Sequence, residues 1–198
     1  MKCSFITMAV LGMIIGIHPA HANNKAVESA LQSHPDLSMF YEALISTGVL
    51  KELKEGDDYT VFAPTNDAFV QIDANEYPCF YSAQCRAEVA AILRNHIIDD
   101  KYTIAELAKR GGNPASSIGK EDIYVEEIFK GQYKAEARGV SGGLETSGSI
   151  VFPIDGVILH GDEIDQFKTL KTSAPSAHLS AHLIPGGSRD EVVPQEKP

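Results

Sequence analysis

A serine, an aspartate and a histidine follow one another in the order that some hydrolases use for nucleophilic catalysis. The segment Gly139–Gly143 fits the pattern G-x-S-x-G around Ser141, and Asp155 and His160 come after it. In such hydrolases the serine lies on a sharp turn between a strand and a helix. Here a glycine-rich loop leads into another β-rich segment, and Asp155 and His160 are only five positions apart. The sequence therefore predicts no catalytic residue, and we expect that the chain is not an enzyme.

Two other patterns have residue types that bind metals. His178 and His182 are four apart, which would place two imidazoles on one face of a helix, but prolines and glycines interrupt this stretch. The acidic run 121–127 is interleaved with apolar residues, which is typical of the solvent face of a strand. Calcium would need several oxygens converging in one loop. The sequence also has no phosphate-binding glycine motif and no haem-attachment cysteine pair, so we expect no metal and no cofactor.

His96 follows a helix-forming segment, 87–93, and precedes the apolar pair Ile97 and Ile98. One interpretation is a buried histidine that holds backbone groups by hydrogen bonds. The other is a residue that contacts a ligand, in a pocket for a small molecule or cofactor near His96. The residue types alone leave both interpretations open.

Cys79 and Cys85 are the cysteines that would remain after removal of an N-terminal leader that contains Cys3. An even number of cysteines in an exported protein favours a disulfide. Two residues six apart in a continuous helix have Cα atoms about 10 Å apart, beyond the roughly 7 Å that a disulfide spans. A disulfide therefore requires a bend, which Pro78 favours; two free thiols are the alternative.

Residues 1–22 have the organisation of a signal peptide. Lys2 provides a positive start, 5–17 is apolar, and Ala20–Ala22 has the small-x-small pattern of a cleavage site. The apolar stretch of about 13 residues is shorter than the roughly 20 that span a bilayer. We expect cleavage between Ala22 and Asn23 and export to the periplasm, the cell surface or the medium; a retained anchor is the alternative.

The charge of the chain argues against two classes of partner. It has 17 Lys and Arg against 27 Asp and Glu, a net charge of −10. An acidic surface repels nucleic-acid phosphates and anionic lipids, so we expect neither nucleic-acid binding nor stable membrane insertion. Residues 171–198 are rich in Ser, Ala, Pro and Gly and poor in apolar residues, which predicts a disordered tail after one domain over 23–170. The oligomeric state stays open.

The first half of the chain favours helices and the second half favours strands, which indicates an α+β fold. Helices are expected from Asn23 or Asn24 to Leu31, from Asp36 or Ser38 to Gly48, over 87–93 and over 103–111, where Thr103 and Glu106 form a capping box. Strands or β-rich segments are expected at 59–63, 123–129, 133–137, 150–154 and 157–159, with a flexible loop at 139–148.

Three segments occur in the order and spacing of the signature boxes of fasciclin domains. Thr60–Phe69 reads T-V-F-A-P-T-N-D-A-F and is similar to the family's T-V-F-A-P-T-[ND]-x-A-F box almost letter for letter. Ile92–Ile98 resembles the L-x-x-Y-H-V-V segment, and Ile150–Ile158 resembles the closing V-x-V-x-x-I-D-x-V-L box. The opening, Phe40–Leu50, is similar to the family's first helices. The box residues expected to support the fold are Phe62, Pro64, Thr65, Asp67, Phe69, Ile154 and Asp155.

The resemblance implies a β-sandwich or wedge with a layer of short helices, in a secreted, single-domain member of bacterial type. It implies adhesion or binding of extracellular or surface proteins or glycans, and it does not imply an enzyme. Asn95 stands where the family has the tyrosine of a Tyr-His pair, so only His96 of that pair carries over. Asn95 and His96 are the binding residues that the resemblance suggests, and the changed tyrosine puts adhesion of the animal receptor type in doubt.

Overall fold

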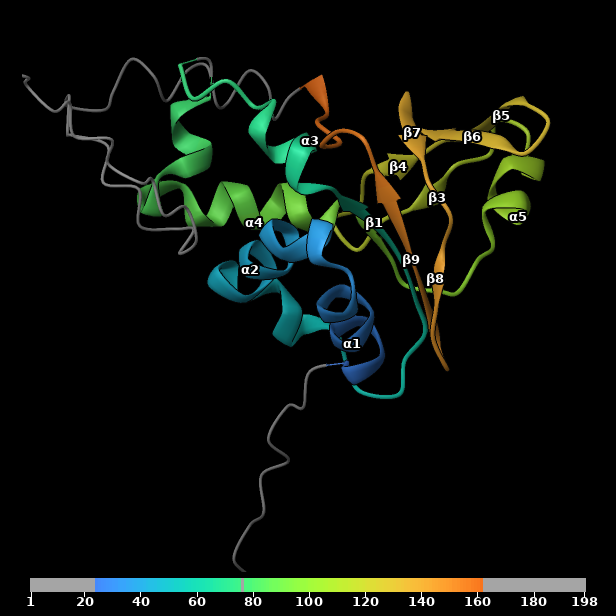
Figure 1. Ribbon diagram of the computed structural model, residues 1–198, viewed down its shortest axis with the longest axis horizontal. Coiled ribbons are helices and arrows are strands. Elements are labelled where there is room, and N and C mark those ends of the chain that lie inside the picture. The colour runs from blue at the N-terminus through green and yellow to red at the C-terminus, as the bar shows by residue number, and fades with distance from the viewer. Residues whose placement is uncertain (1–23, 76, 162–198) are drawn as a thin grey trace, which may run out of the picture.

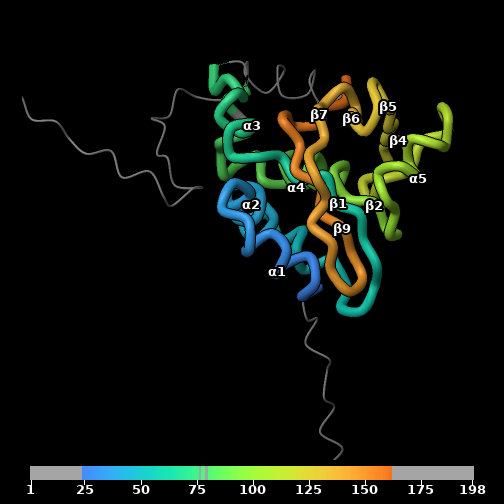
Figure 2. Tube along the Cα trace, turned by 45° about the vertical axis from the view of Figure 1, so that its right-hand side comes forward, coloured from blue at the N-terminus to red at the C-terminus, as the bar shows by residue number. Residues whose placement is uncertain are grey.

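Figure 1 shows the computed structural model of the protein, which describes residues 24–75 and 77–161. The predicted leader 1–22, the cleavage site between Ala22 and Asn23, and the tail 171–198 lie outside the described residues. Helices α1 to α4 gather at one end of the molecule, and α5 lies at the opposite end beside β5 and β6 (Figures 1 and 2). The α-helices are α1 (Lys25–Ser33), α2 (Ser38–Thr47), α3 (Asn66–Val70), α4 (Arg86–Arg94) and α5 (Ile104–Lys109). The 3₁₀ helices are η1 (Pro35–Leu37), η2 (Val49–Glu52), η3 (Pro78–Tyr81) and η4 (Ala83–Cys85).

Within the described residues, the strands form a sheet of seven and a sheet of two, and they close no barrel. The larger sheet has the order β2-β1-β9-β7-β6-β5, with β8 on β9; β3 and β4 form the smaller one. The strands are β1 (Tyr59–Pro64), β2 (Ile97–Ile98), β3 (Ala115–Ser116), β4 (Asp122–Ile123), β5 (Val125–Phe129), β6 (Gln132–Ala135), β7 (Arg138–Val140), β8 (Leu144–Glu145) and β9 (Ser149–Ile154). Helices and strands are largely segregated along the chain, so the predicted α+β fold with a layer of short helices is confirmed.

The centre of the sheet is the parallel pair β1 and β9. All six residues of each strand are buried, and they pair in register from Tyr59 opposite Ser149 to Pro64 opposite Ile154. A parallel pair that is covered on both faces needs nearly continuous apolar sequence, which both strands have. These two strands come from two of the predicted boxes, which explains why the boxes are so apolar.

Side chains of β1 and β9 alternate between two apolar cores. Val61 and Val151 belong to the larger core, which includes Phe40 and the helices α1, α2 and α4. Phe62 and Phe152 point to the other face, where their rings stack with centroids 5.8 Å apart. This alternation is the period of two that a pleated strand imposes. The sheet therefore separates a helix-covered core from a second core beneath α5 and the small sheet.

Two predicted helix caps are confirmed by hydrogen bonds. The Asn24 side chain accepts a hydrogen bond from the backbone N–H of Val27 at 3.1 Å, at the start of α1. Thr103 and Glu106 form the reciprocal capping box of α5. Gly48 ends α2 in the left-handed conformation, with φ of 88°, which a residue with a Cβ adopts only under strain.

The prediction that Asp36 or Ser38 caps α2 was wrong. The helix begins at Ser38. Its N-cap position is Leu37, whose apolar side chain makes no capping hydrogen bond. Instead the Oδ1 atom of Asn66 accepts a hydrogen bond from the backbone N–H of Met39 at 2.9 Å. This cap comes from a residue 27 positions away, so local sequence could not identify it.

The segment 139–148 is not the flexible loop that its glycines suggested. It contains the end of β7 and all of β8, both paired with β9. A Cβ atom on Gly143 would lie 2.6 Å from the Phe152 ring, so this glycine permits close packing of chain segments. The segment 157–159 is also not a strand, although Val157 and Ile158 are buried.

Candidate functional site

His96 is completely buried between α4 and the segment that follows β9. Its Nδ1 atom lies 2.8 Å from the carbonyl oxygen of Ile92, and the backbone N–H of Ile158 donates to its Nε2 atom at 2.9 Å. Because Nε2 accepts a hydrogen bond, the ring proton must be on Nδ1, which then donates to Ile92. Burial, with smaller contributions from the nearby His160 and Arg138, lowers the pKa of His96 from 6.5 to about 4. At neutral pH the ring is therefore uncharged and connects two distant parts of the backbone.

Asn95 is buried next to His96, with 3 % of its surface exposed. Its Oδ1 atom accepts a hydrogen bond from the Ser117 hydroxyl at 3.2 Å. A Cβ atom on Gly119 would lie 1.8 Å from the same oxygen, so the backbone of the loop after β3 lies directly against Asn95. Both residues that the resemblance suggested for binding thus contact the interior of the domain in this structure, and a binding role for either stays a prediction.

Five of the predicted box residues lie at the junction of β1 and α3. Phe62 and Phe69 are buried, and Pro64 pairs with Ile154 at the end of β9. The Thr65 hydroxyl accepts a hydrogen bond from the backbone N–H of Ala68 at 3.3 Å, so it caps α3. Asp67 is exposed in the first turn of this helix, where its negative charge interacts favourably with the positive end of the helix dipole. Each residue therefore has a structural environment that accounts for its type.

The residues of the hydrolase-like pattern have other roles. Ser141 lies between β7 and β8, and not between a strand and a helix. The Asp155 carboxylate, directly after β9, accepts a hydrogen bond from the backbone N–H of Gly139 in β7 at 2.7 Å, so it connects these two strands. The strand β8 follows Ser141 in place of the helix that a nucleophilic serine of this type requires.

Cys79 and Cys85 lie on two separate 3₁₀ helices, η3 and η4, which join at Ser82. The continuous helix that would keep them too far apart is thus absent from this part of the described chain. The side chain of Cys79 lies outside the described residues, so the disulfide stays a prediction.

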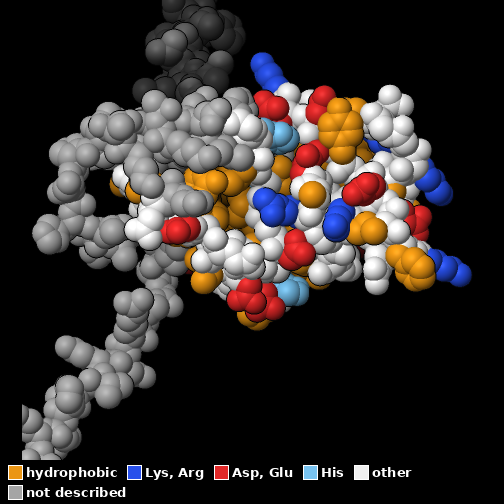
Figure 3. All heavy atoms as spheres, turned by 90° about the horizontal axis from the view of Figure 1, so that it is seen from above, with side chains coloured by type: hydrophobic (Ala, Val, Ile, Leu, Met, Phe, Trp, Pro, Cys, Tyr) orange, Lys and Arg blue, Asp and Glu red, His pale blue; other side chains and the backbone are white. Residues whose placement is uncertain are grey.

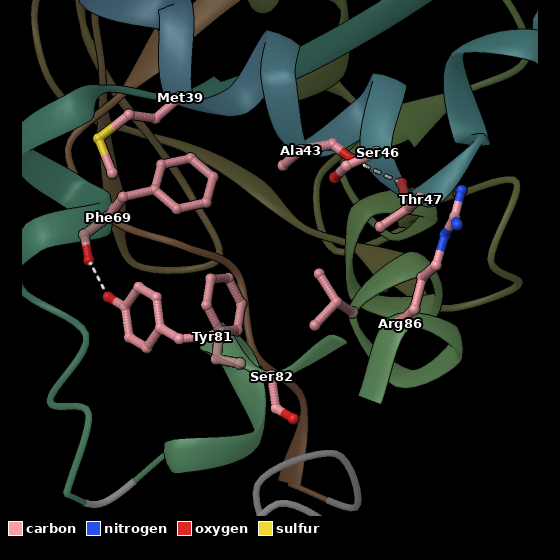
Figure 4. Close-up of a pocket in the computed structure, with 10 residues that line it drawn as sticks. Met39, Ala43, Ser46, Thr47, Phe69, Tyr81, Ser82 and Arg86 are labelled. Carbon is pink, nitrogen blue, oxygen red and sulfur yellow. Dashed lines mark hydrogen bonds between the residues drawn. The ribbon is translucent and has the colours of Figure 1, made fainter. Parts of the chain in front are cut away.

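A pocket lies at the helical end of the molecule, between α2, α3, α4 and the η3–η4 segment (Figure 4). The empty space between its lining residues amounts to about 490 Å³, a figure that includes space open to solvent. Its apolar walls are Met39, Ala43, Phe69, Phe80, Tyr81 and Val89, and its polar residues are Ser46, Thr47, Ser82 and Arg86. His96 does not line this pocket; the Phe40 ring lies between them, 5.9 Å from His96 and 6.5 Å from Phe69.

Exposed apolar side chains gather at the opposite end, around the terminal strand β5. Tyr124 is 50 % exposed, Ile128 53 % and Phe129 71 %. Figure 3 shows apolar side chains exposed among acidic and basic ones at this end. We call Tyr124, Ile128 and Phe129 the β5 edge surface. The pairing of β5 with β6 shifts between Glu127 and Phe129, on either side of Ile128.

The part of the chain that the structure describes has neither a metal-binding cluster of side chains nor a membrane-spanning helix. No group of three or more His, Cys, Asp or Glu residues there could hold a metal ion. None of the helices described is long and apolar enough to cross a membrane.

Comparisons with known proteins agree with this architecture. A family model for the fasciclin domain matches residues 35–160. The chain is 28 % identical over 123 residues to protein sll1483 of the cyanobacterium Synechocystis sp., a match that covers 62 % of this chain and 66 % of that protein.

A solved FAS1 domain pair from the insect cell adhesion molecule fasciclin I has the same fold. The TM-score is 0.60 at 22 % identity, over 70 % of this chain and 52 % of the other, so this chain spans about half the length of that structure. Fasciclin domains are associated with cell adhesion and are typically extracellular or displayed on surfaces. Since the family match extends over more than half of its length and the fold agrees, the chain belongs to the fasciclin domain family.

Proposed function

We propose that this protein is an exported binding module that acts at the cell surface or in the extracellular matrix, and that it is not an enzyme. It contacts a surface protein or a glycan through the β5 edge surface. The observation that carries this proposal is the exposure of three large apolar side chains, one directly before the terminal strand β5 and two in its last two residues. Exposed apolar clusters of this kind mark interaction sites, because leaving them in water is unfavourable.

The geometry of β5 favours a protein partner. No strand among the described residues pairs with its outer edge, since β5 ends the strand order and β6 lies on the other side. A partner segment could add to this edge as a further strand and cover the apolar side chains. Glu126 and Glu127 are exposed on the same strand, so a partner with basic side chains is favoured. A glycan that stacks on Tyr124 and Phe129 is the alternative within the same surface.

Polar substitutions in the β5 edge surface should weaken partner binding and leave the domain folded. We expect the double variant Ile128→Ser, Phe129→Ser to bind its partner at least about tenfold more weakly, because exposed apolar anchors carry most of the energy of such contacts. Its stability should change by no more than about 0.5 kcal/mol per substitution, since both side chains are exposed. The measurement is binding of the labelled mature domain to protein and glycan arrays, with melting temperatures measured in parallel.

The matched control is Ile45→Ser, Val70→Ser, which removes two exposed apolar residues at the helical end, 46 % and 73 % exposed. This variant should bind like the unchanged protein. Equal binding by the β5 variant and the control would contradict the proposed surface. If the unchanged protein sediments as a dimer and only the β5 variant is monomeric, a second copy of the chain would be the partner.

Export and the disulfide are tested together by the mass of the exported protein. We expect a chain that begins at Asn23, with Cys79 and Cys85 joined, since the oxidising compartment and the bend at η3–η4 both favour the bond. Closing so short a loop stabilises the domain by roughly 2 kcal/mol. Intact mass spectrometry after alkylation without reductant should show no modified thiol. A chain that begins at Met1 would refute cleavage of the leader, and a chain in which Cys79 and Cys85 are both alkylated would refute the disulfide.

A further inference from the structure

The pocket at the helical end is separate from the β5 edge surface. The match to the fasciclin family does not indicate a ligand for it. We propose that this pocket binds an amphipathic monocarboxylate, such as a fatty acid, with the apolar body between the aromatic walls and the carboxylate on Arg86. The chemistry of the pocket lining carries the proposal, and it does not depend on the function proposed above.

The walls of the pocket suit an apolar body. The Phe80 ring lies 5.9 Å from the Phe69 ring and 5.5 Å from the Tyr81 ring, so three aromatic rings pack in sequence. Figure 4 shows the space between these rings and the α2 residues, with Met39 beside Phe69. The flexible thioether of Met39 can adjust to ligands of different shape. A flat or extended hydrocarbon would find apolar contact on each of these sides.

Most hydroxyl groups of the lining already make hydrogen bonds within the protein. The single proton of the Tyr81 hydroxyl is shared between the carbonyl oxygens of Phe69 and Ile72, at 2.9 and 3.1 Å. The hydroxyls of Ser46 and Thr47 donate to the backbone of their own helix, both to the carbonyl oxygen of Ala43. A sugar or another ligand with many hydroxyls would therefore find few partners here. The lining favours a ligand whose polar part is small.

Arg86 is the cation of the pocket. Its side chain is exposed, makes no ion pair within the described part of the chain, and lies beside Thr47 on the side opposite Met39 (Figure 4). A guanidinium pairs with a carboxylate through two parallel hydrogen bonds. One cation matches one negative charge, whereas a phosphate with two charges would leave part of its charge unpaired. An apolar wall with a single guanidinium at one side thus fits a monocarboxylate.

Calorimetric titration of the full mature protein with decanoate and with decanol tests the proposal. We expect decanoate to bind, and decanol to bind about tenfold more weakly because it lacks the charge. Arg86→Gln should weaken decanoate binding about tenfold and leave decanol binding unchanged. The charge control is Lys51→Gln, an exposed cation on η2 that does not line the pocket, which should bind both ligands normally.

A second variant fills the pocket. Ala43→Leu places a larger side chain among the rings and should abolish binding of both ligands, while Ala87→Leu, at an exposed position of α4 outside the lining, should not. The proposal is overturned if decanoate does not bind the unchanged protein, if Ala43→Leu binds it normally, or if Arg86→Gln has no selective effect on decanoate. Array binding through the β5 edge surface should be the same in all four variants, so the two proposals can fail separately.

Discussion

Replacing Phe62 by Ala should destabilise the domain by about 3–5 kcal/mol. Phe62 is completely buried at the centre of β1, and its ring stacks on Phe152 of the parallel partner β9. Truncation removes the apolar contacts and leaves a cavity in the second core, on the face of the sheet; β1 and β9 cannot shift to fill it, because both are paired on their two edges. The free energy of unfolding, obtained from urea denaturation at neutral pH, measures this effect.

The control for Phe62→Ala is the same substitution of a phenylalanine at an exposed position. Phe129→Ala removes a ring of equal size that is 71 % exposed, so its stability should change by no more than about 0.5 kcal/mol. Binding should respond in the opposite way: the Phe129 variant loses affinity while folded, and the Phe62 variant loses binding only where it unfolds. Equal destabilisation by both substitutions would show that the core assignment of the first box is wrong.

His96 should make stability depend on pH between about 4 and 6.5. The folded protein holds the ring neutral, with a pKa of about 4, because it is buried, whereas the unfolded chain has the ordinary value of 6.5. Between these values the unfolded state binds more protons, so the free energy of unfolding rises with pH. The contribution of His96 is complete above pH 6.5, is lost as the pH falls towards 4, and changes no further below that. The difference in pKa corresponds to about 3 kcal/mol.

His96→Gln separates this effect from other titrating groups. A glutamine can accept the hydrogen bond from the backbone N–H of Ile158 but cannot be protonated, so we expect a loss of roughly 1–3 kcal/mol at pH 7. Between pH 7 and pH 4 the variant should lose about 3 kcal/mol less than the unchanged protein. Urea denaturation of both proteins at the two pH values gives this comparison. Identical pH dependence would show that His96 is not held neutral, and unchanged stability with lost binding would make it a contact residue.

The sequence predicted the parts of the fold in which local chemistry and tertiary packing agree. The box Thr60–Phe69 combines an apolar strand, a proline that ends it and a threonine that caps the next helix, and the structure uses each in that way. The capping box at Thr103 and the glycine that ends α2 were found for the same reason. These signals depend on residues within one or two turns of one another.

Other features depend on contacts between distant segments and could not be predicted. The Asn66 cap of α2 and the close approach of Gly143 to Phe152 join residues that are far apart in the chain. The β5 edge surface was missed because the exposure of Tyr124, Ile128 and Phe129 depends on the place of β5 at the end of the sheet, which local sequence does not reveal. The pocket was missed because four separate helical segments form it, and only packing brings them together.

Hydrogen exchange of the mature domain, alone and with its strongest array partner, tests the central claim most directly. We expect amides of β5 and β6 to exchange more slowly in the complex, because a partner on the outer edge of β5 shields that strand and steadies its neighbour. Amides around Asn95 and His96 should be unchanged, since both side chains are already buried. Slower exchange confined to the segment around His96, with β5 unaffected, would contradict the account.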